Sequence, residues 1–386
     1  MDDNRIKKIV ICGNYGATNL GDEAILDGII RILKSSHPDA DLTVLSANPE
    51  GTRSLHKINS VHLFPSGFRT FFRGIFQGTI GRTINTIKNS DLFILGGGGL
   101  FTDEKFMAVI IWAIQARIAR FYGVPVFCLG QSVGPLNTLA GRRITQSVYL
   151  KTVGSTVRDR QSLDLLSKLG INNSTELSDP AFMLSSNEPV DIKDESYVVI
   201  SVRPWIRNNE VLSENLASFI VWLWREKGLK SLLVPLQIEK DNDLGCMNTI
   251  LERAGYIVEN NGESTADFVE IFEYTADTNR IIELMSEAKV VIGMRLHSLI
   301  LATIAQCPFI GISYSDKVMN FGERVGMKDY ILDLNMDMGE DGLSKLEEKY
   351  EKMIKDEEIE SKLANALLTE RSKARKHIEI LEEILT

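Results

Sequence analysis

The sequence lacks the features that mark membrane-spanning, secreted and metal-binding proteins. Its 386 residues include only four cysteines, too scattered for a metal-type spacing or a disulfide framework: Cys12, Cys128, Cys246 and Cys307. No apolar run reaches the roughly 20 residues that cross a bilayer, and the first residues contain no apolar signal region. We therefore expect a cytoplasmic protein without a bound metal ion.

The chain also lacks an excess of positive charge. A net charge of −9 argues against a general nucleic-acid binder, and 44% hydrophobic with 25% charged residues is typical of globular proteins. The length exceeds one ordinary core. We expect a first domain over residues 1–184, an acidic linker over 185–195 and a second domain over 196–336. A helical tail over 337–386 is expected, by analogy with two-domain α/β transferases, to cross back to the first domain.

One segment, residues 51–90, contains no acidic residue at all. Between residues 68 and 88, Phe and Ile recur at helical spacing beside Lys and Arg, which is typical of an element lying on an anionic membrane surface. This interpretation predicts peripheral membrane contact and a location at the inner face of the membrane. The alternative is a core helix whose outer face is basic.

The sequence does contain a repeated order of buried strand, glycine-rich or polar turn, and helix. The pattern predicts an α/β fold with two Rossmann-like, doubly wound domains. The expected strands cover residues 6–12, 42–45, 91–95, 124–129 and 153–157 in the first half, and 197–202, 231–235, 256–258, 290–292 and 309–312 in the second.

The first strand runs into a glycine-rich turn that lacks the G-x-G-x-x-G dinucleotide pattern. The strand over 42–45 also lacks the following acidic residue that would bind a NAD ribose, which excludes a dehydrogenase. Asn19 in the turn and Asp22 in the first helical turn are candidates for binding a sugar hydroxyl, and the alternative for Asp22 is helix capping. We interpret Glu23 as helix-capping chemistry.

Four consecutive glycines follow the strand over 91–95. Glycine lets the backbone approach a neighbour closely, so we expect Gly98 and Gly99, with Asp103 beyond them, to contact a ligand or the opposing domain. After the strand over 153–157, two interpretations stay open. Arg158 and Arg160 contact an anion, or Asp159 and Arg160 pair near a helix that begins at Ser162.

A cationic stretch follows two strands of the second half. Arg295 and His297 stand at the entrance of an apolar helix after strand 290–292, and Asp316 and Lys317 follow strand 309–312. The carboxyl ends of neighbouring parallel strands line one crevice, so these side chains should converge. A cationic site beside a helix N-terminus suits a small anion.

In chain order, several of these motifs resemble the polysaccharide pyruvyl transferase family. They are Gly13-Asn-Tyr-Gly through Asn19-Leu-Gly-Asp-Glu-Ala, the Gly96 run, Gly130-Gln-Ser-Val-Gly-Pro, Val157-Arg-Asp-Arg, Ser178-Asp-Pro-Ala, Val202-Arg, Gly293-Met-Arg-Leu-His and Ser313-Tyr-Ser-Asp-Lys-Val. The resemblance implies a two-domain fold like that of GT-B glycosyltransferases. It also implies transfer of pyruvate from phosphoenolpyruvate onto two sugar hydroxyls as a ketal, with release of phosphate and without a cofactor.

The family's functional residues map onto the cationic stretch. The resemblance implies catalytic roles for Arg295, His297 and Lys317, and phosphoenolpyruvate binding by Arg203, Arg295 and Lys317. His297 is the expected general acid, because imidazole changes charge near neutral pH. The alternative for His297 is a helix-entry residue bonded to a loop carbonyl. We assign no role to the other histidines, His37, His56, His62 and His377.

The expected acceptor is a sugar or a lipid-linked glycan, held by Asn19, Asp22, Gly98, Gly99 and Asp103. Two other functions compete with this one. A GT-B nucleotide-sugar glycosyltransferase would use the same arginines and helix N-terminus for a diphosphate. A non-catalytic scaffold would dock on membranes through residues 51–90. The sequence gives no indication of an oligomeric state.

Overall fold

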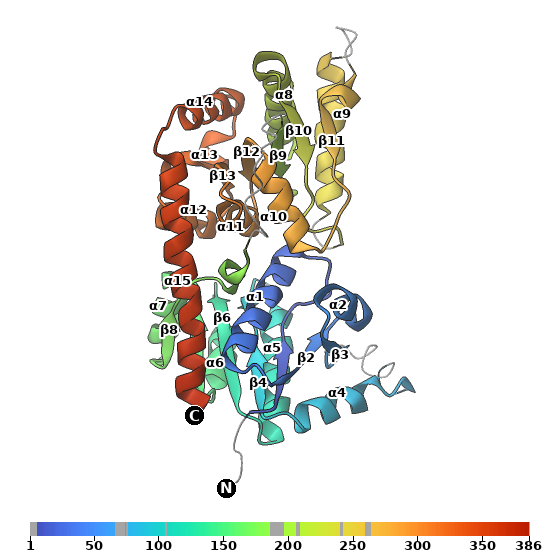
Figure 1. Ribbon diagram of the computed structural model, residues 1–386, viewed down its shortest axis with the longest axis vertical. Helices are drawn as coiled ribbons and strands as arrows, with labels where there is room; N and C mark the ends of the chain where they lie inside the picture. Colours follow the sequence, from blue (N-terminus) through green and yellow to red (C-terminus); the bar gives the residue numbers. More distant parts are fainter. Residues whose placement is uncertain are drawn as a thin grey trace. The chain divides into compact units, whose positions relative to one another are not determined.

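A computed structural model describes residues 6–65, 74, 76–104, 106–185, 197–205, 209–239, 242–258 and 264–385. The chain forms two compact units (Figure 1). Unit 1 comprises Met1–Ala17, Asp22–Leu184 and Glu370–Thr386, and unit 2 comprises Thr18–Gly21 and Ser185–Thr369. The chain therefore passes into unit 2 for one short loop, returns, and passes again after Leu184. The expected linker over 185–195 lies, from residue 186 on, outside the described residues.

Unit 1 is built on a parallel sheet with the strand order β3-β2-β1-β4-β6-β7-β8, and β5 pairs with β6. Its strands are β1 (Lys8–Cys12), β2 (Asp41–Ser46), β3 (Asn59–His62), β4 (Leu92–Leu95), β5 (Gly98–Phe101), β6 (Val126–Val133), β7 (Gly154–Val157) and β8 (Ser174–Glu176). Its helices are α1 (Leu20–Ser36), α2 (Pro49–His56), α4 (Thr79–Lys88), α5 (Phe106–Phe121), α6 (Leu139–Tyr149) and α7 (Arg160–Lys168).

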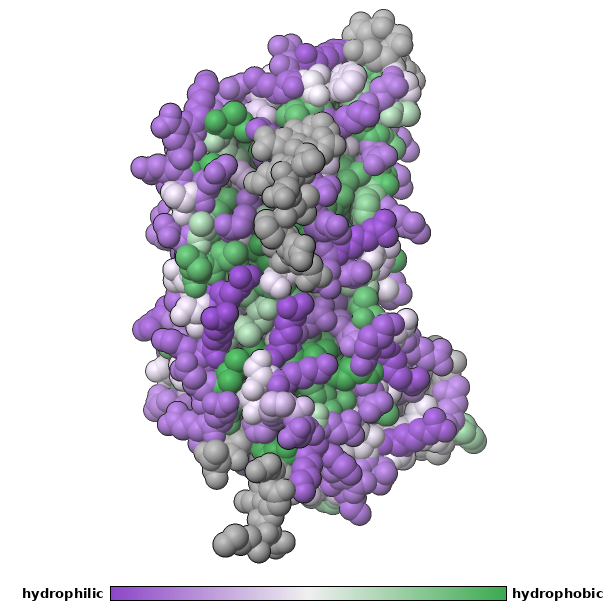
Figure 2. Space-filling view, in the orientation of Figure 1, coloured by the Kyte–Doolittle hydropathy of each residue, from purple (hydrophilic) through white to green (hydrophobic). Residues whose placement is uncertain are grey.

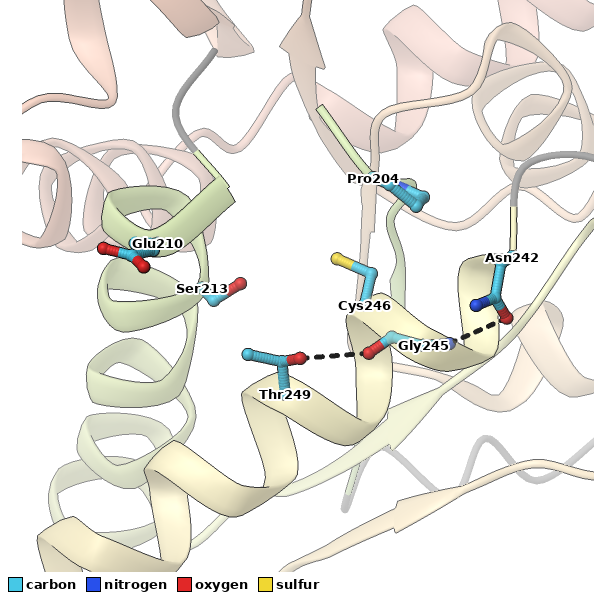
Figure 3. A pocket seen from close by; sticks show the side chains of 7 residues that line it. All are labelled: Pro204, Glu210, Ser213, Asn242, Gly245, Cys246 and Thr249. Atoms are coloured by element: carbon cyan, nitrogen blue, oxygen red, sulfur yellow. Dashed lines mark hydrogen bonds between the residues drawn. The ribbon is translucent and has the colours of Figure 1, made fainter. Parts of the chain in front are cut away.

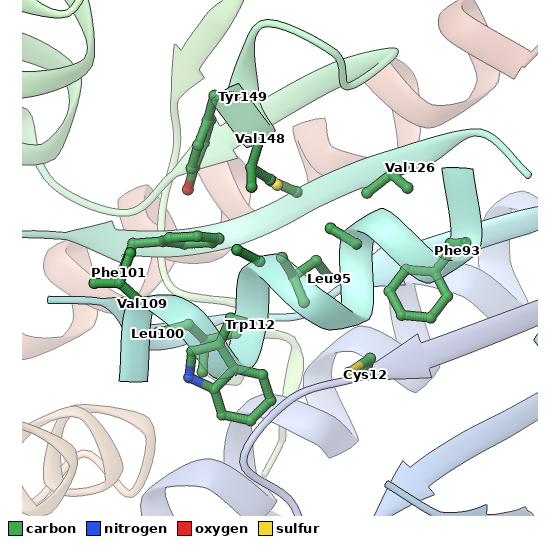
Figure 4. Packing of buried hydrophobic residues seen from close by; sticks show 14 of the residues in the cluster. Cys12, Phe93, Leu95, Leu100, Phe101, Val109, Trp112, Val126, Val148 and Tyr149 are labelled. Atoms are coloured by element: carbon green, nitrogen blue, oxygen red, sulfur yellow. The ribbon is translucent and has the colours of Figure 1, made fainter. Parts of the chain in front are cut away.

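The central strands of unit 1 are apolar on both faces because both faces are covered by helices. Along β1, Ile9 and Ile11 enter one core cluster, and Val10 and Cys12 enter the other. This alternation follows from the period of two along a strand. The cluster that contains Val10 and Cys12 packs β4 and β6 against α5 (Figure 4). In it, the rings of Phe101 and Tyr149 pack edge-on with 5.3 Å between their centroids.

Unit 2 repeats the same plan in a smaller sheet, with the parallel order β11-β10-β9-β12-β13-β14. Its strands are β9 (Tyr197–Ser201), β10 (Lys230–Leu233), β11 (Val269–Ile271), β12 (Val290–Gly293), β13 (Phe309–Ser313) and β14 (Ile331–Asp333). Its helices are α8 (Asn209–Lys227), α9 (Asp243–Val258), α10 (Thr278–Glu287), α11 (Leu296–Ile304), α12 (Asp316–Arg324), α13 (Leu334–Asp337) and α14 (Gly342–Ile354). The prediction of two doubly wound α/β domains is confirmed.

The last helix, α15 (Ile359–Leu385), belongs to both units. Its first part packs in unit 2, where Gln306 donates a hydrogen bond to the carbonyl of Leu363. In unit 1, Nε2 of His377 lies 3.0 Å from the carbonyl of Ser178, and Leu381 is fully buried among residues of α1 and β1. The expected tail is thus divided between the units at Glu370.

One expected strand is wrong. Residues 256–258 form the end of α9, because Ile250, Ala254 and Val258 are spaced four apart and are all buried on one helical face. In the unit 2 sheet, the edge strand next to β10 is β11 instead.

The basic segment is described only in part, since residues 66–73 and 75 lie outside the described residues. Within α4, Ile80 and Ile87 are buried, whereas Arg82 and Lys88 are exposed and Phe76 before the helix is 88% exposed. No helix within the described ranges is long and apolar enough to span a membrane. On the face drawn in Figure 2, hydrophobic residues show between a majority of hydrophilic ones.

Candidate active site

The candidate residues gather at one kind of place in each sheet. In each sheet, successive strands are added on one side of the first strand and then on its other side. The strand order therefore reverses between β1 and β4 in unit 1, and between β9 and β12 in unit 2. Ligands of doubly wound sheets bind outside the carboxyl ends of the strands at this switch point. Each unit therefore presents one candidate site of its own.

In unit 2, the cationic residues follow three adjacent strands. Gly293, which ends β12, pairs with Ser201 of β9 on one side and with Gly311 of β13 on the other. Arg203 follows the end of β9 by two residues, and Arg295 and His297 follow β12. Lys317 lies in the first turn of α12, directly after β13. The parallel register thus brings all four expected residues to the same edge of one sheet.

Arg295 is fixed by a buried carboxylate that the sequence did not reveal. Its Nε and Nη2 donate to the two oxygens of Asp243 at 3.0 and 2.6 Å, and Asp243 is completely buried. One Asp243 oxygen also accepts the backbone N–H groups of Leu236 and Gln237. These two bonds use two of the five guanidinium N–H donors. Arg295 therefore anchors the loop before α9 as well as standing at the N-terminus of α11.

His297 lies in the first turn of α11 and is half-buried. It packs against Gly21 of the short loop Thr18–Gly21, which belongs to unit 2. A side chain on Gly21 would collide with the imidazole. The loop is held by a bond from the N–H of Leu20 to the carbonyl of Leu236 and by a bridge between Asn19 and Gln237. The structure thus brings Asn19 into the same unit as His297 and groups Asp22 with the other unit.

Arg203 is positioned by aromatic residues. Its Nη1 donates to the hydroxyl of Tyr314 at 3.1 Å, and its guanidinium carbon lies 5.0 Å from the centre of that ring. The ring of Trp205 packs against Tyr314 with 5.2 Å between centroids. Cation–π contact and a hydrogen bond together restrict the guanidinium to one orientation. Tyr314 stands between two expected site residues in sequence, but no sequence pattern assigned it this contact.

In unit 1, Asn14, Asp22 and Gly98 meet at the switch point between β1 and β4. The amide of Asn14 donates to Asp22 at 2.7 Å. Gly98 has a φ of +92°, and a side chain there would come within 3.3 Å of the other Asp22 oxygen. A carboxylate and an amide beside open backbone can bind sugar hydroxyls, which both donate and accept hydrogen bonds.

Two other glycines of the run, Gly96 and Gly97, have a structural explanation. A side chain on Gly96 would overlap the hydroxyl of Tyr15, and one on Gly97 would meet Ile25. At these two positions, the group that approaches the glycine backbone closely is therefore a side chain of unit 1 itself. Gly99 is exposed.

Asp103, also expected to contact the acceptor, closes a loop within unit 1. Its oxygens accept the N–H of Asn137 at 2.8 Å, and the N–H and hydroxyl of Thr138 at 2.6 and 2.7 Å. Burial raises the pKa of Asp103, but these bonds outweigh it and hold the pKa below its ordinary value. These contacts give the carboxylate a role in joining β5 to the start of α6.

The sequence missed a buried ionic cluster in unit 1. Nε2 of His56 lies 2.7 Å from Glu23 and its Nδ1 lies 2.6 Å from Asp27, while the other Glu23 oxygen accepts the N–H of Gly16. Burial lowers the pKa of His56, but the two carboxylates outweigh burial and raise it to about 9. His56 is thus an imidazolium that ties α2 to α1.

The two arginines after β7 also have internal partners. Arg158 forms a buried ion pair with Asp179, and Arg160 pairs with Asp164 one helical turn away. Asp159 accepts bonds from the N–H and hydroxyl of Ser162 and caps α7, which begins at Arg160. Asp159 and Arg160 therefore act at this helix separately, each with another partner.

The described residues contain no group of three or more His, Cys, Asp or Glu placed to hold a metal ion. All four cysteines are buried and unpaired with one another. Three of them, Cys12, Cys128 and Cys246, have a pKa raised by burial, so their thiols are neutral at physiological pH.

Comparison with known proteins finds one relative by sequence and others by structure, each matched over nearly the whole chain. The chain is 22% identical to the amylovoran biosynthesis protein AmsJ of Erwinia amylovora, over 94% of this chain and 96% of that protein. It is similar in structure to Anabaena HepE in complex with UDP-glucose, with a TM-score of 0.60 and 14% identity over 98% of both chains.

A UDP-GlcNAc 2-epimerase from Methanocaldococcus jannaschii superposes with a TM-score of 0.65 at 12% identity, over 98% of this chain and all of that one. At such identities these two structures support the two-domain GT-B-like fold alone. The polysaccharide pyruvyl transferase family matches residues 19–316, which is more than half of the chain. The matched range contains Arg203, Arg295 and His297, and Lys317 is the first residue after it. The chain belongs to the polysaccharide pyruvyl transferase family.

Proposed function

We propose that the protein transfers pyruvate from phosphoenolpyruvate to two hydroxyls of a sugar, in a cell-surface polysaccharide or its lipid-linked precursor, and releases phosphate. The observation that carries this proposal is the convergence of Arg203, His297 and Lys317 at the ends of three adjacent strands, beside the N-terminus of α11. Three cation-forming side chains at one sheet edge suit a donor that carries a phosphate and a carboxylate on one small skeleton.

The proposed roles divide between binding and proton transfer. Arg203 and Lys317 hold the two anionic groups of the donor, and Lys317 also stabilises the departing phosphate. Arg295, whose orientation is fixed by Asp243, adds a further positive charge beside the N-terminus of α11. His297 is the general acid, since a protonated imidazole can deliver a proton and recover it near neutral pH.

The reaction balances without a further reactant. His297 protonates the methylene carbon of phosphoenolpyruvate, and the resulting oxocarbenium-like carbon is attacked by the first sugar hydroxyl. The carbon–oxygen bond to phosphate then breaks, and the second hydroxyl attacks the same carbon to close the ketal. Of the two hydroxyl protons, one restores His297 and one leaves with phosphate. The amylovoran relative supports a role in polysaccharide biosynthesis, and a sugar as acceptor follows from the family.

The experiment is thermal stabilisation followed by turnover. Phosphoenolpyruvate should raise the melting temperature, because a ligand that binds only the folded state stabilises it. UDP and GDP should not, whereas a nucleotide-sugar glycosyltransferase would be stabilised by one of them. A scaffold would release no phosphate in the presence of an acceptor. Stabilisation by UDP or GDP, and none by phosphoenolpyruvate, would overturn the proposal.

A further inference from the structure

A pocket of about 360 Å³ lies in unit 2 between the N-terminal turns of α8 and α9 (Figure 3). Glu210 and Ser213 line it from α8, and Pro204 lines it from the loop after β9. Its volume is at the small end of the range of ligand pockets, about 300–1,000 Å³. A space of this size suits one sugar ring better than a nucleotide sugar.

Further described lining residues come from α9 and the residue before it: Asn242, Gly245, Cys246 and Thr249. Asn242 caps the helix by accepting the N–H of Gly245 at 3.2 Å, and the hydroxyl of Thr249 donates to the carbonyl of Gly245 at 3.1 Å. In Figure 3 the sulfur of Cys246 and the hydroxyl of Ser213 point toward one another. The walls are therefore two well-formed helical turns, held by their own hydrogen bonds.

The pocket adjoins the cationic site through neighbouring residues of the chain. Pro204 follows Arg203 directly, and Asn242 precedes Asp243, the carboxylate that holds Arg295. The strands before these two loops, β9 and β10, are hydrogen-bonded neighbours. A ligand in the pocket would thus lie beside the groups proposed to bind the donor.

The lining favours a polyhydroxyl ligand over an anion. Among the described residues, its lining offers the hydroxyls of Ser213 and Thr249, the amide of Asn242 and the carboxylate of Glu210, and no Lys, Arg or His. Sugar hydroxyls both donate and accept hydrogen bonds, so they match all four groups, whereas Glu210 would repel a phosphate or carboxylate. Burial raises the pKa of Cys246 to about 11, so the thiol that lines the pocket is neutral at physiological pH.

Resting on the proposed function, we infer that this pocket binds one monosaccharide unit of the acceptor through its ring hydroxyls. Acceptor recognition then belongs at least in part to unit 2, beside the donor residues. The glycine loops of unit 1, with Asn14 and Asp22, are the competing location. Measuring sugar binding without turnover distinguishes these two locations.

The test measures binding of methyl β-glycosides of glucose, galactose, mannose, N-acetylglucosamine and N-acetylmannosamine by saturation-transfer difference NMR, without donor. Thr249→Phe fills the pocket from an exposed position. Asn248→Phe is the matched control, because Asn248 is the exposed neighbour on the same helix and does not line the pocket. Asp22→Asn tests the competing site.

We expect at least one glycoside to bind the wild type, Asn248→Phe and Asp22→Asn, and to bind Thr249→Phe at least about tenfold more weakly. Stabilisation by phosphoenolpyruvate should be equal in wild type, Asn248→Phe and Thr249→Phe, which shows that the donor site is intact. Unchanged glycoside binding in Thr249→Phe, loss of binding only in Asp22→Asn, or no binding of any glycoside would overturn the inference. Glycoside binding without donor stabilisation would instead contradict the proposed function and leave the sugar pocket standing.

Discussion

At the scale of single residues, a substitution of His297 tests catalysis separately from donor binding. Replacing it by Gln keeps a side chain of similar size beside Gly21, but removes the proposed general acid. We expect phosphate release to fall about 10²–10⁴-fold, the usual contribution of a general acid, while donor stabilisation persists. His62→Gln is the control, because His62 is exposed in unit 1. Turnover of His297→Gln within about tenfold of wild type would remove His297 from the mechanism.

Asp243 is expected to position Arg295 without touching the substrate. Asp243→Asn preserves shape and loses the charge of a buried, bidentate pair. Hydrogen bonds to charged groups contribute about 1.5–3 kcal/mol, so KM for phosphoenolpyruvate should rise about tenfold or more with a smaller change in kcat. Asp267→Asn, at an exposed carboxylate of unit 2, should change neither constant. A fall in kcat at unchanged KM would assign Asp243 a different role.

His56 gives unit 1 a pH-dependent stability. Its pKa rises on folding from an ordinary 6.5 to about 9, so the stabilisation is complete below pH 6.5 and is lost as the pH rises through about 9. The contribution at low pH is roughly 3 kcal/mol. The free energy of unfolding of unit 1, measured against His56→Gln from about pH 6 to about pH 10, should show the two proteins converging. A difference that stays constant over this range would mean that His56 is neutral in the folded protein.

At the scale of elements, the first two glycines after β4 are explained by packing inside unit 1. Gly96→Ala should lower the free energy of unfolding by about 1–3 kcal/mol, since its side chain would overlap the Tyr15 hydroxyl. That hydroxyl is buried without a hydrogen-bond partner among the described residues. Tyr15→Phe should therefore have little effect alone.

The double variant of Gly96→Ala and Tyr15→Phe should recover part of the loss, with a coupling of about 1 kcal/mol in a denaturation cycle. Gly81→Ala is the control, because no atom lies near that position and α4 should gain about 0.5–1 kcal/mol. Strict additivity of the two changes would show that the glycine serves something other than Tyr15.

The central strands could be predicted from the sequence because each is an apolar run bounded by glycine or polar residues. Their order in the two sheets, and the short strands β3, β5, β8, β11 and β14, were not predicted. The short strand expected at 256–258 failed for the opposite reason, since three apolar residues cannot distinguish a strand from the last turn of a helix. The place of the cationic residues could be predicted because each lies in the loop or first helical turn that follows a strand. Their partners Asp243 and Tyr314 could not, because only tertiary packing brings them to Arg295 and Arg203.

At the scale of the whole molecule, the chain is divided between units in ways that no periodicity indicates. The loop Thr18–Gly21 joins unit 2, and the last part of α15 joins unit 1. There, the hydroxyl of Ser178 donates to buried Glu370, and its carbonyl accepts from His377. Burial lowers the pKa of His377 to about 4, so this contact holds a neutral imidazole above that pH. Such partners are separated by about two hundred residues and depend on the finished fold.

The proposed function also belongs to the whole molecule, because it needs donor, acid and acceptor together. The most direct measurement is incubation of the full chain with phosphoenolpyruvate and a panel of lipid-linked and free β-glycosides, followed by mass spectrometry and phosphate assay. We predict that one glycan gains a ketal-linked pyruvate in step with phosphate release, and that His297→Gln lowers both rates about 10²–10⁴-fold. Transfer of a sugar from a UDP- or GDP-sugar to the same glycans, with phosphoenolpyruvate left unconsumed, would contradict the account.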